Sequence, residues 1–260
     1  MYHLLVTDFD QTLLDSDEAI PLSTMVEIDR IRKSGVLFAV ATGRILRSVL
    51  EYNRDFPFLD YVVACNGAYV YDVSKGISIF KKSVGTAIIR KIKKMYGDCD
   101  IYFCTTMDWH LCQKDIVFSE FLGTRQSFTS FYEKYKDEIY KIEVHFKTKK
   151  ERDSAYQELE ELKVKATYNK QFYGKKDYLI EFTAFGIDKK IGIDKICKRE
   201  KIKLSEAVAI GDSDNDISMV ASCGVGVAVS NATKDLKKIA DLKTASNDTK
   251  GVEKIIKKLF

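Results

Sequence analysis

Two aspartates separated by one residue, Asp8 and Asp10, stand at the end of a short apolar run near the start of the chain. That run, Leu4 to Val6, is typical of a buried strand. Carboxylates directly after such a strand lie at the carboxyl edge of a sheet, where open α/β folds bind ligands. Burying two carboxylates without a counter-ion is costly, so we expect either a bound cation or a solvated pair. An ordinary turn or helix cap is the alternative.

A second apolar run, Val36 to Ala41, is followed by Thr42 and Gly43. These two residues are predicted to open a helix over Ile45 to Arg54. A helix N-terminus can bind an anion, because it presents free N–H groups and the positive end of the helix dipole. Thr42 would add a hydroxyl donor to such a site. A plain threonine cap is the alternative.

A third apolar run, Ala207 to Gly211, precedes four polar residues within five positions: Asp212, Asp214, Asn215 and Asp216. The spacing resembles the start of an EF-hand calcium loop. No glycine follows Asp216, however, and no acidic residue ends a twelve-residue loop, so that interpretation fails. The cluster instead indicates a second source of Mg²⁺ ligands. A helix-capping role for Asp212 and Asp216 is the alternative.

A lysine near residue 190 completes the set of candidate residues. Asp188 is predicted to cap a helix carrying Ile191 and Ile196, which places Lys189 in its first turn. Lysine there opposes the helix dipole, so we expect a bound phosphate or the aspartate cluster to favour it. In a chain with 42 Lys and Arg residues, a solvated surface lysine is the alternative.

In their order and spacing, these four segments resemble the motifs of the haloacid dehalogenase-like (HAD) phosphatase superfamily, over nearly the whole chain. The subgroup it resembles is the Cof-type phosphatases (HAD-IIB). Further marks of that subgroup are Ala41 to Arg44, Asn66 to Ala68, Asn231 with Ala232, and the tail from Lys237 to Val252. Two residues depart from the pattern. Gln11 stands where glycine usually follows the second aspartate, and Lys190 where glycine often follows the motif lysine.

The resemblance implies a Mg²⁺-dependent phosphatase that forms an aspartyl-phosphate. Asp8 would be the nucleophile, and Asp10 the general acid and then the base. The implied metal ligands are the Asp8 side chain, the Asp10 backbone carbonyl and the Asp212 side chain. Asp216 would hold a metal-bound water or support the ligands. The residues implied to bind phosphate are Thr42, Gly43, Arg44, Asn215 and Lys189, and Lys189 also counts as catalytic. For Arg44, a salt bridge with a helix is the alternative.

Composition agrees with such an enzyme. A hydrophobic content of 45% can form cores, and 31% charged residues suit a solvated surface. No apolar run approaches the ~20 residues of a membrane span, and a strand begins almost at once, which argues against a signal peptide. Six cysteines without a Cys-x-x-Cys pair predict reduced thiols and a cytoplasmic location. A net charge of +4 with dispersed lysines argues against nucleic acid as a partner.

The order of elements predicts an α/β fold of two domains. Residues 1–81 and 187–260 should form the core with its parallel sheet, which the resemblance implies is Rossmann-like, and Asn66 and Gly67 should turn a hairpin in it. Residues 82–186 should form an inserted α+β cap, which the resemblance identifies as type C2. The cap elements are expected at Val84–Tyr96, Ile101–Phe103, Trp109–Cys112, Lys141–Phe146, Glu151–Leu162, Val164–Tyr168 and Tyr178–Thr183. Trp109 and His110 share a cap strand. Either they line a substrate pocket, or one of them is a core residue and the other is exposed.

The resemblance implies small soluble phosphomonoesters as substrates, such as sugar phosphates, nucleotides, flavin mononucleotide (FMN) or pyridoxal phosphate, and a monomer or dimer. A phosphomutase is the first alternative, because it shares the aspartate nucleophile. A phospho-accepting signalling module is the second. Such receiver domains combine acidic residues, Mg²⁺, Thr and Lys around a phosphorylated aspartate, but they need neither the second aspartate nor a cap of about 100 residues.

Overall fold

The computed structural model describes residues 2–54, 57–161, 166–173 and 177–260. The chain divides into two compact units. Unit 1 is Met1–Phe80 with Asp188–Phe260, and unit 2 is Lys81–Ile187. The boundaries expected from the sequence lie one residue away from these.

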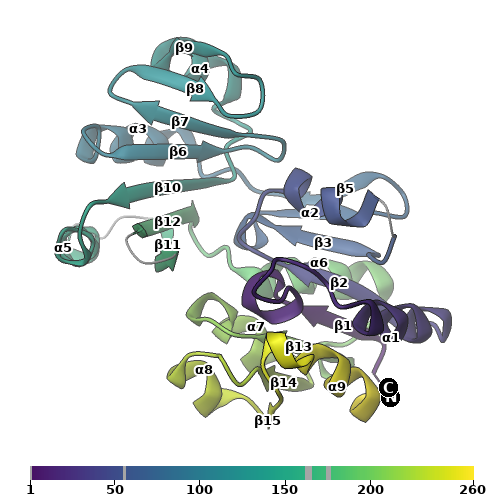
Figure 1. Cartoon of the computed structure of the whole chain (residues 1–260). Helices are drawn as coiled ribbons and strands as arrows, with labels where there is room; N and C mark the ends of the chain where they lie inside the picture. Colours follow the sequence, from purple (N-terminus) through teal and green to yellow (C-terminus); the bar gives the residue numbers. More distant parts are fainter. Residues whose placement is uncertain (1, 55–56, 162–165, 174–176) are drawn as a thin grey trace. The chain divides into compact units, whose positions relative to one another are not determined.

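Unit 1 is built on a sheet that has eight strands in the described residues, in the order β15-β14-β13-β1-β2-β3-β4-β5 (Figure 1). The strands are β1 (Leu4–Thr7), β2 (Leu37–Ala41), β3 (Tyr61–Ala64), β4 (Tyr69–Asp72), β5 (Ile77–Lys81), β13 (Ala207–Gly211), β14 (Val225–Ala228) and β15 (Leu242–Lys243). The helices are α1 (Leu22–Lys33), α2 (Leu46–Arg54), α6 (Lys189–Glu200), α7 (Ile217–Ser222), α8 (Lys234–Ile239) and α9 (Gly251–Leu259).

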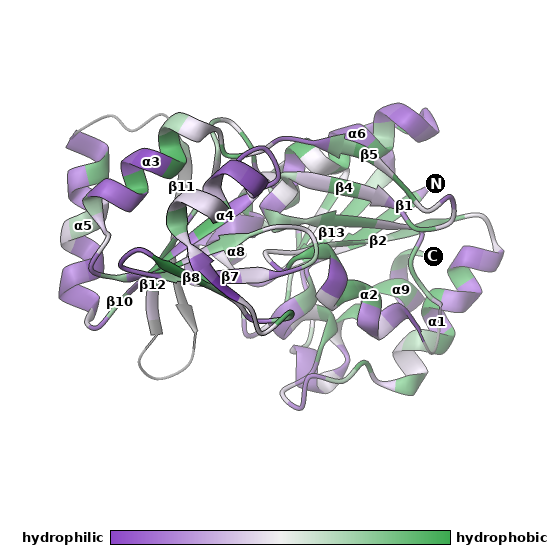
Figure 2. Cartoon of the chain, turned by 90° about the horizontal axis from the view of Figure 1, so that it is seen from above, coloured by the Kyte–Doolittle hydropathy of each residue, from purple (hydrophilic) through white to green (hydrophobic). Residues whose placement is uncertain are grey.

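The central strands of this sheet are parallel and buried. All strands from β15 to β3 run parallel to their neighbours, and β4 returns antiparallel to β3. Helix α6 lies on one face of the sheet, whereas α1, α2 and α9 lie on the other (Figure 2). Both faces are therefore covered, and this is why β1, β2 and β13 are almost continuously apolar in sequence.

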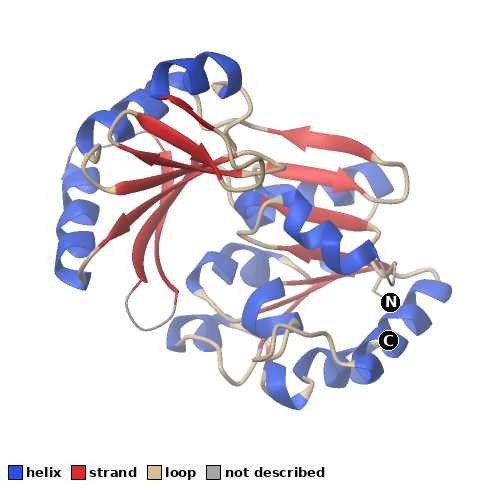
Figure 3. Cartoon of the chain, turned by 45° about the horizontal axis from the view of Figure 1, so that its top comes forward, coloured by secondary structure: helices blue, strands red, loops and turns tan. Residues whose placement is uncertain are grey.

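Unit 2 contains an antiparallel sheet of seven strands in the described residues, in the order β11-β12-β10-β6-β7-β8-β9. The strands are β6 (Asp100–Cys104), β7 (Trp109–Gln113), β8 (Ile116–Ser119), β9 (Arg125–Ser127), β10 (Lys141–Phe146), β11 (Ala166–Tyr173) and β12 (Asp177–Ala184). The helices α3 (Thr86–Met95), α4 (Phe128–Tyr135) and α5 (Lys149–Glu161) cover one face (Figure 3). Apolar side chains alternate toward that face; in β10 they are Ile142, Val144 and Phe146.

The elements expected in unit 2 are present with shifted ends. The predicted strand at Val164–Tyr168 is described from Ala166 as part of β11, and residues 162–165 lie outside the described chain. In unit 2 the sequence did not predict β8, β9 or α4, because these segments are short, and it did not predict β5 of unit 1 either. His110 is buried beside a half-exposed Trp109, as the second interpretation of this strand expected. None of the described helices is long and apolar enough to cross a membrane.

Candidate active site

Three neighbouring strands bring the motif residues of unit 1 to one edge. Strands β13, β1 and β2 lie side by side and parallel, with Thr7 of β1 aligned with Ile210 and Val40 of its neighbours. The residues that follow these strands are Asp212, Asp8 and Thr42. Parallel strands end at a common edge, so residues about 200 positions apart meet there.

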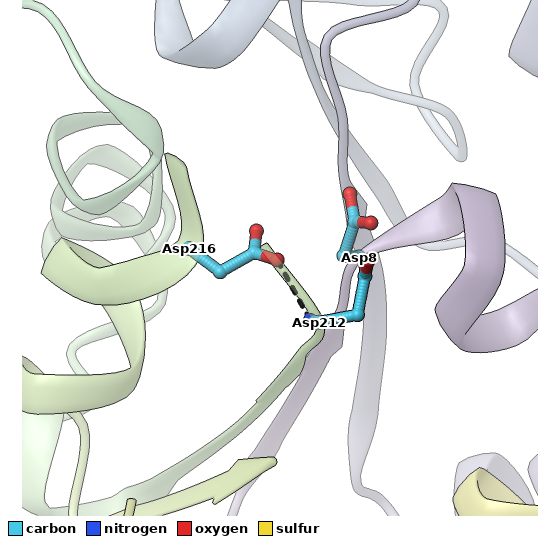
Figure 4. Close-up of side chains that lie close together, drawn as sticks. All are labelled: Asp8, Asp212 and Asp216. Atoms are coloured by element: carbon cyan, nitrogen blue, oxygen red, sulfur yellow. Dashed lines mark hydrogen bonds between the residues drawn. The ribbon is translucent and has the colours of Figure 1, made fainter. Parts of the chain in front are cut away.

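The carboxylates of Asp8, Asp212 and Asp216 form a compact acidic group. One oxygen from each carboxylate lies within 4.8 Å of the other two, and all three residues are buried (Figure 4). Asp10 is not a member of this group. An all-oxygen donor set that is buried and rich in negative charge fits a divalent metal ion.

Lys189 is the cation that the structure itself supplies to this group. Its Nζ lies 2.6 Å from Asp8 Oδ1 and 2.6 Å from Asp216 Oδ1, and the residue is 1% exposed. Helix α6 begins at Lys189, and Asp188 caps it by accepting a hydrogen bond from the N–H of Ile191 at 3.0 Å. The predicted position in the first turn is confirmed, and the surface-lysine alternative is wrong.

Lys190 takes the outward direction instead. Its ammonium pairs with Asp194 one turn along the helix, at 2.8 Å. The departure from glycine at this position therefore leaves Lys189 as the lysine that reaches the carboxylates.

The electrostatics reflect an excess of negative charge. Burial raises the pKa of Asp8 well above its ordinary value; Lys189 lowers it, and the neighbouring carboxylates of Asp216 and Asp212 raise it. Burial, followed by the charge of Asp216, raises the pKa of Asp212 to about 6. Burial lowers the pKa of Lys189, but Asp216 and Asp8 raise it by more, so the ammonium stays charged. One lysine does not balance three carboxylates, and a divalent cation would.

Asp216 combines two of the roles considered from the sequence. Its Oδ2 accepts hydrogen bonds from the backbone N–H of Asp212 at 2.9 Å and of Ser213 at 3.0 Å, while Oδ1 faces Lys189. The capping alternative is thus correct for one oxygen of Asp216. Asp212 is oriented by Thr12, whose hydroxyl donates to its Oδ1 at 2.9 Å.

Asp10 turns toward Arg44 rather than toward the carboxylate group. The Arg44 Nε lies 3.0 Å from both carboxylate oxygens of Asp10, and the guanidinium also lies over the rings of Phe9 and Tyr52. Burial lowers the pKa of Arg44, but its hydrogen bonds and charge interaction with Asp10 raise it by more. The salt-bridge alternative for Arg44 is therefore correct, and its partner Asp10 lies in the short helical turn Phe9–Leu13.

Thr42 neither begins nor caps a helix, so its predicted position and the plain-cap alternative are wrong, although the helix predicted over Ile45–Arg54 is present. Helix α2 starts at Leu46, four positions later. Thr42 continues the pairing of β2 with β3, because its backbone N–H donates to Val63 O of β3 at 2.8 Å. Its hydroxyl accepts the N–H of Arg44 at 3.0 Å, which turns the chain tightly around Gly43.

Asn215 is held from both sides of its amide. Its Oδ1 accepts from the Ser213 hydroxyl at 2.6 Å, and its Nδ2 donates to Asn66 Oδ1 at 3.1 Å. The sequence identified Asn66 as a subgroup mark and a turn residue, with a place at the hinge between core and cap as a further hypothesis, and it gave no role to Ser213 or Thr12. The sequence did offer one signal for a role of Asn66 in the site: it is a polar residue soon after strand β3, at the same edge of the sheet as the other motifs.

Comparison with known proteins finds similar sequences and structures over nearly the whole chain. A model of haloacid dehalogenase-like hydrolases matches residues 5–256. A 5-amino-6-(5-phospho-D-ribitylamino)uracil phosphatase of Bacillus subtilis is 24% identical, over 99% of this chain and 97% of its own. A phosphoglycolate phosphatase of Methanopyrus kandleri is 25% identical, over 100% and 98%. The solved structure of a HAD subclass IIB sugar phosphatase matches with a TM-score of 0.76 at 25% identity, over 98% of each chain.

Proposed function

Because the chain belongs to the family of haloacid dehalogenase-like hydrolases, we propose that it is a Mg²⁺-dependent phosphatase of small phosphomonoesters. The observation that carries this proposal is the buried group of Asp8, Asp212 and Asp216, with Lys189 between two of its members. Phosphoryl transfer needs a carboxylate nucleophile and cations that offset the charge of the phosphate. This one edge of the sheet holds both.

The metal ligands follow from the donor types. We propose that Mg²⁺ is held by the side chains of Asp8 and Asp212 and the backbone carbonyl of Asp10, while Asp216 supports a bound water. Mg²⁺ prefers oxygen ligands and keeps several waters, which suits a site with few protein donors. When bound, it removes the repulsion between a phosphate dianion and an anionic nucleophile.

In the proposed reaction Asp8 acts as the nucleophile, and Asp10 acts first as the acid and then as the base. An oxygen of Asp8 attacks phosphorus as the bond to the leaving alcohol breaks, and Asp10 gives that alcohol its proton. Asp10 then takes a proton from the water that hydrolyses the aspartyl-phosphate. The direction of the Asp10 side chain supports this assignment, because its contact with Arg44 keeps the carboxylate away from the metal ligands.

The phosphate oxygens are bound by the remaining motif residues. We assign this role to Lys189, the Thr42 hydroxyl, the loop at Gly43 and the Asn215 amide. The role of Lys189 is supported by its ammonium, which contacts the Asp8 carboxylate. For Arg44, pairing with Asp10 supports orientation of the general acid rather than direct phosphate binding.

The proposed substrates are small soluble phosphates, namely sugar phosphates, nucleotides, FMN or pyridoxal phosphate. The relatives are named for a ribitylaminouracil phosphate, for phosphoglycolate and for sugars, which supports this range without selecting a member. A phosphate-release screen over a metabolite panel with Mg²⁺ tests the proposal. We expect inorganic phosphate from at least one ester. A chain that only returned an isomeric phosphate would be a phosphomutase, and one that released none would contradict the proposal.

A further inference from the structure

The turn after strand β3 has an unusual backbone. Three consecutive residues have positive φ angles: 50° at Cys65, 52° at Asn66 and 98° at Gly67. Side-chain-bearing residues rarely adopt this left-handed region, although asparagine tolerates it better than most. All three residues are buried. Strained backbone of this kind persists only where the surroundings hold it, and it often accompanies a functional site.

Asn66 links two segments of the proposed phosphate site. Its backbone N–H donates to Thr42 O at 2.9 Å, and its side-chain Oδ1 accepts from Asn215 Nδ2 at 3.1 Å. The residue is 3% exposed, so both bonds are shielded from water. The residue before it, Cys65, donates its N–H to Arg44 O at 2.9 Å. The turn is thus fastened to the phosphate loop as well as to the aspartate segment.

Gly67 brings the same turn against the start of helix α6. A Cβ atom at this position would lie 1.9 Å from the backbone oxygen of Asp188, which no side chain allows. Asp188 is the cap residue directly before Lys189. The turn Cys65–Gly67 therefore contacts the three segments that carry Thr42, Asn215 and Lys189.

We propose that Asn66 is a positioning residue that fixes the amide of Asn215 in the orientation that binds phosphate. This inference rests on the proposed function. The Oδ1 of Asn215 accepts from Ser213, and one N–H donates to Asn66. Among the described residues the second N–H has no hydrogen-bond partner, so it is the donor left for a phosphate oxygen. A rotated amide would present its carbonyl oxygen to the phosphate instead. Asn66 acts through Asn215 and does not touch the substrate.

A double-mutant cycle tests this role. Asn66→Gly removes the side chain but still adopts the left-handed backbone, so the turn should keep its shape. We expect the inhibition constant of inorganic phosphate and the KM for p-nitrophenyl phosphate to rise about tenfold, the effect of one well-placed hydrogen bond. In an Asn215→Ala background the same change should have almost no further effect, because its target is gone.

Asn53 provides the matched control. It is a buried asparagine of the same unit, and its Oδ1 accepts from the N–H groups of Phe58 and Leu59 outside the site. Asn53→Ala should lower the midpoint temperature of unfolding while leaving phosphate inhibition unchanged. This separates loss of a buried amide from loss of a phosphate-site contact.

The experiment distinguishes a failure of the positioning role from a failure of the proposed function. Independent, multiplicative effects of Asn66→Gly and Asn215→Ala, or unchanged phosphate inhibition in Asn66→Gly, would overturn the positioning role and leave the phosphatase proposal standing. A wild-type chain that hydrolyses no phosphate ester would overturn the proposed function and this inference together.

Discussion

At the scale of single residues, the site depends on one lysine that holds two carboxylates in place. Lys189 is fully surrounded by protein and lies 2.6 Å from both Asp8 and Asp216. Removing Lys189 from this network would be strongly destabilising, because it would leave the buried carboxylates without a compensating charge. The same contact keeps an oxygen of Asp8 beside a cation before any substrate binds. Lys189 therefore links the stability of the site to its chemistry.

The nucleophile gives the first prediction. Asp8→Asn should keep the fold and abolish turnover of p-nitrophenyl phosphate, because an amide cannot attack phosphorus. Steady-state rates with Mg²⁺ measure this. Asp17→Asn makes the same chemical change at an exposed position of the loop that follows, and it should keep wild-type activity. Near wild-type turnover by Asp8→Asn would refute the proposed mechanism.

The general acid gives the second prediction. Asp10→Asn should slow the phosphorylation of Asp8 much more when the donor is a sugar phosphate than when it is p-nitrophenyl phosphate. The reason is that a sugar alkoxide is a far poorer leaving group than p-nitrophenolate. General acid–base catalysis is worth about 10²–10⁴-fold. Dephosphorylation should slow for both substrates, so pre-steady-state kinetics are needed to isolate the first step.

Glu18 supplies the control for Asp10. Its carboxylate also approaches Arg44, at 3.8 Å, but it is exposed. Glu18→Gln should leave the ratio of the two phosphorylation rates unchanged. If Asp10→Asn slowed both substrates equally, Asp10 would be a structural residue paired with Arg44 rather than an acid.

At the scale of elements, a buried histidine joins β7 to α4 in unit 2. His110 is 2% exposed and packs against the rings of both Phe131 and Tyr135, with centroid distances of 4.9 Å to each. Neither ring nitrogen has a hydrogen-bond partner among the described residues. Burial lowers the pKa of His110; nearby Asp108 raises it and Lys134 lowers it. The neutral form is therefore the one that fits this packing.

This shift predicts a pH dependence of unit 2. Because the folded pKa of His110 lies below its unfolded value of about 6.5, the unfolded chain binds the proton more readily. The contribution of neutral His110 to the free energy of unfolding is complete above the unfolded pKa. It falls as the pH drops through the unfolded pKa toward the folded pKa. The midpoint temperature of unit 2, followed by near-UV circular dichroism, should decrease from about pH 7.5 to about pH 5, and less so in His110→Phe.

A second histidine provides the comparison. His3 is exposed and belongs to unit 1, so His3→Gln should leave the pH effect on unit 2 intact. An equal pH effect in wild type and His110→Phe would show that other groups are responsible.

At the scale of the whole molecule, metal binding should act on one of the two units. The acidic group lies entirely in unit 1, so Mg²⁺ should raise the unfolding temperature of that unit and leave the unit 2 transition unchanged. A ligand that binds only the folded state stabilises it by about 2.7 kcal/mol at a hundredfold excess over Kd. Differential scanning calorimetry with and without Mg²⁺ measures both transitions.

Activity should follow the same metal. EDTA should remove phosphate release and excess Mg²⁺ should restore it, whereas Ca²⁺ should inhibit. Calcium takes more ligands at longer distances, and this would misplace the nucleophile relative to phosphorus. Full activity in excess chelator would exclude the metal-binding roles of Asp8 and Asp212.

The sequence by itself determined the local part of this protein. Apolar runs that end in Asp8, Thr42 and Asp212 predict buried parallel strands, because a strand covered on both faces must be apolar along its length. Such strands end at a common edge, so the sequence also predicted the side of the sheet where the motifs meet. Asp188 as a helix cap, with Lys189 following it, was readable for the same reason: capping depends on residues three positions apart.

Only the tertiary structure decided which side chains face one another. The pairing of Asn66 with Asn215 joins residues 149 positions apart, and that of Thr12 with Asp212 joins residues 200 apart. The direction of Asp10 toward Arg44 is of the same kind. A pattern of residue types records the period of a strand or helix and the chemistry of its ends. The contacts between ends depend on strand order and on the register of each neighbour, which no local pattern contains.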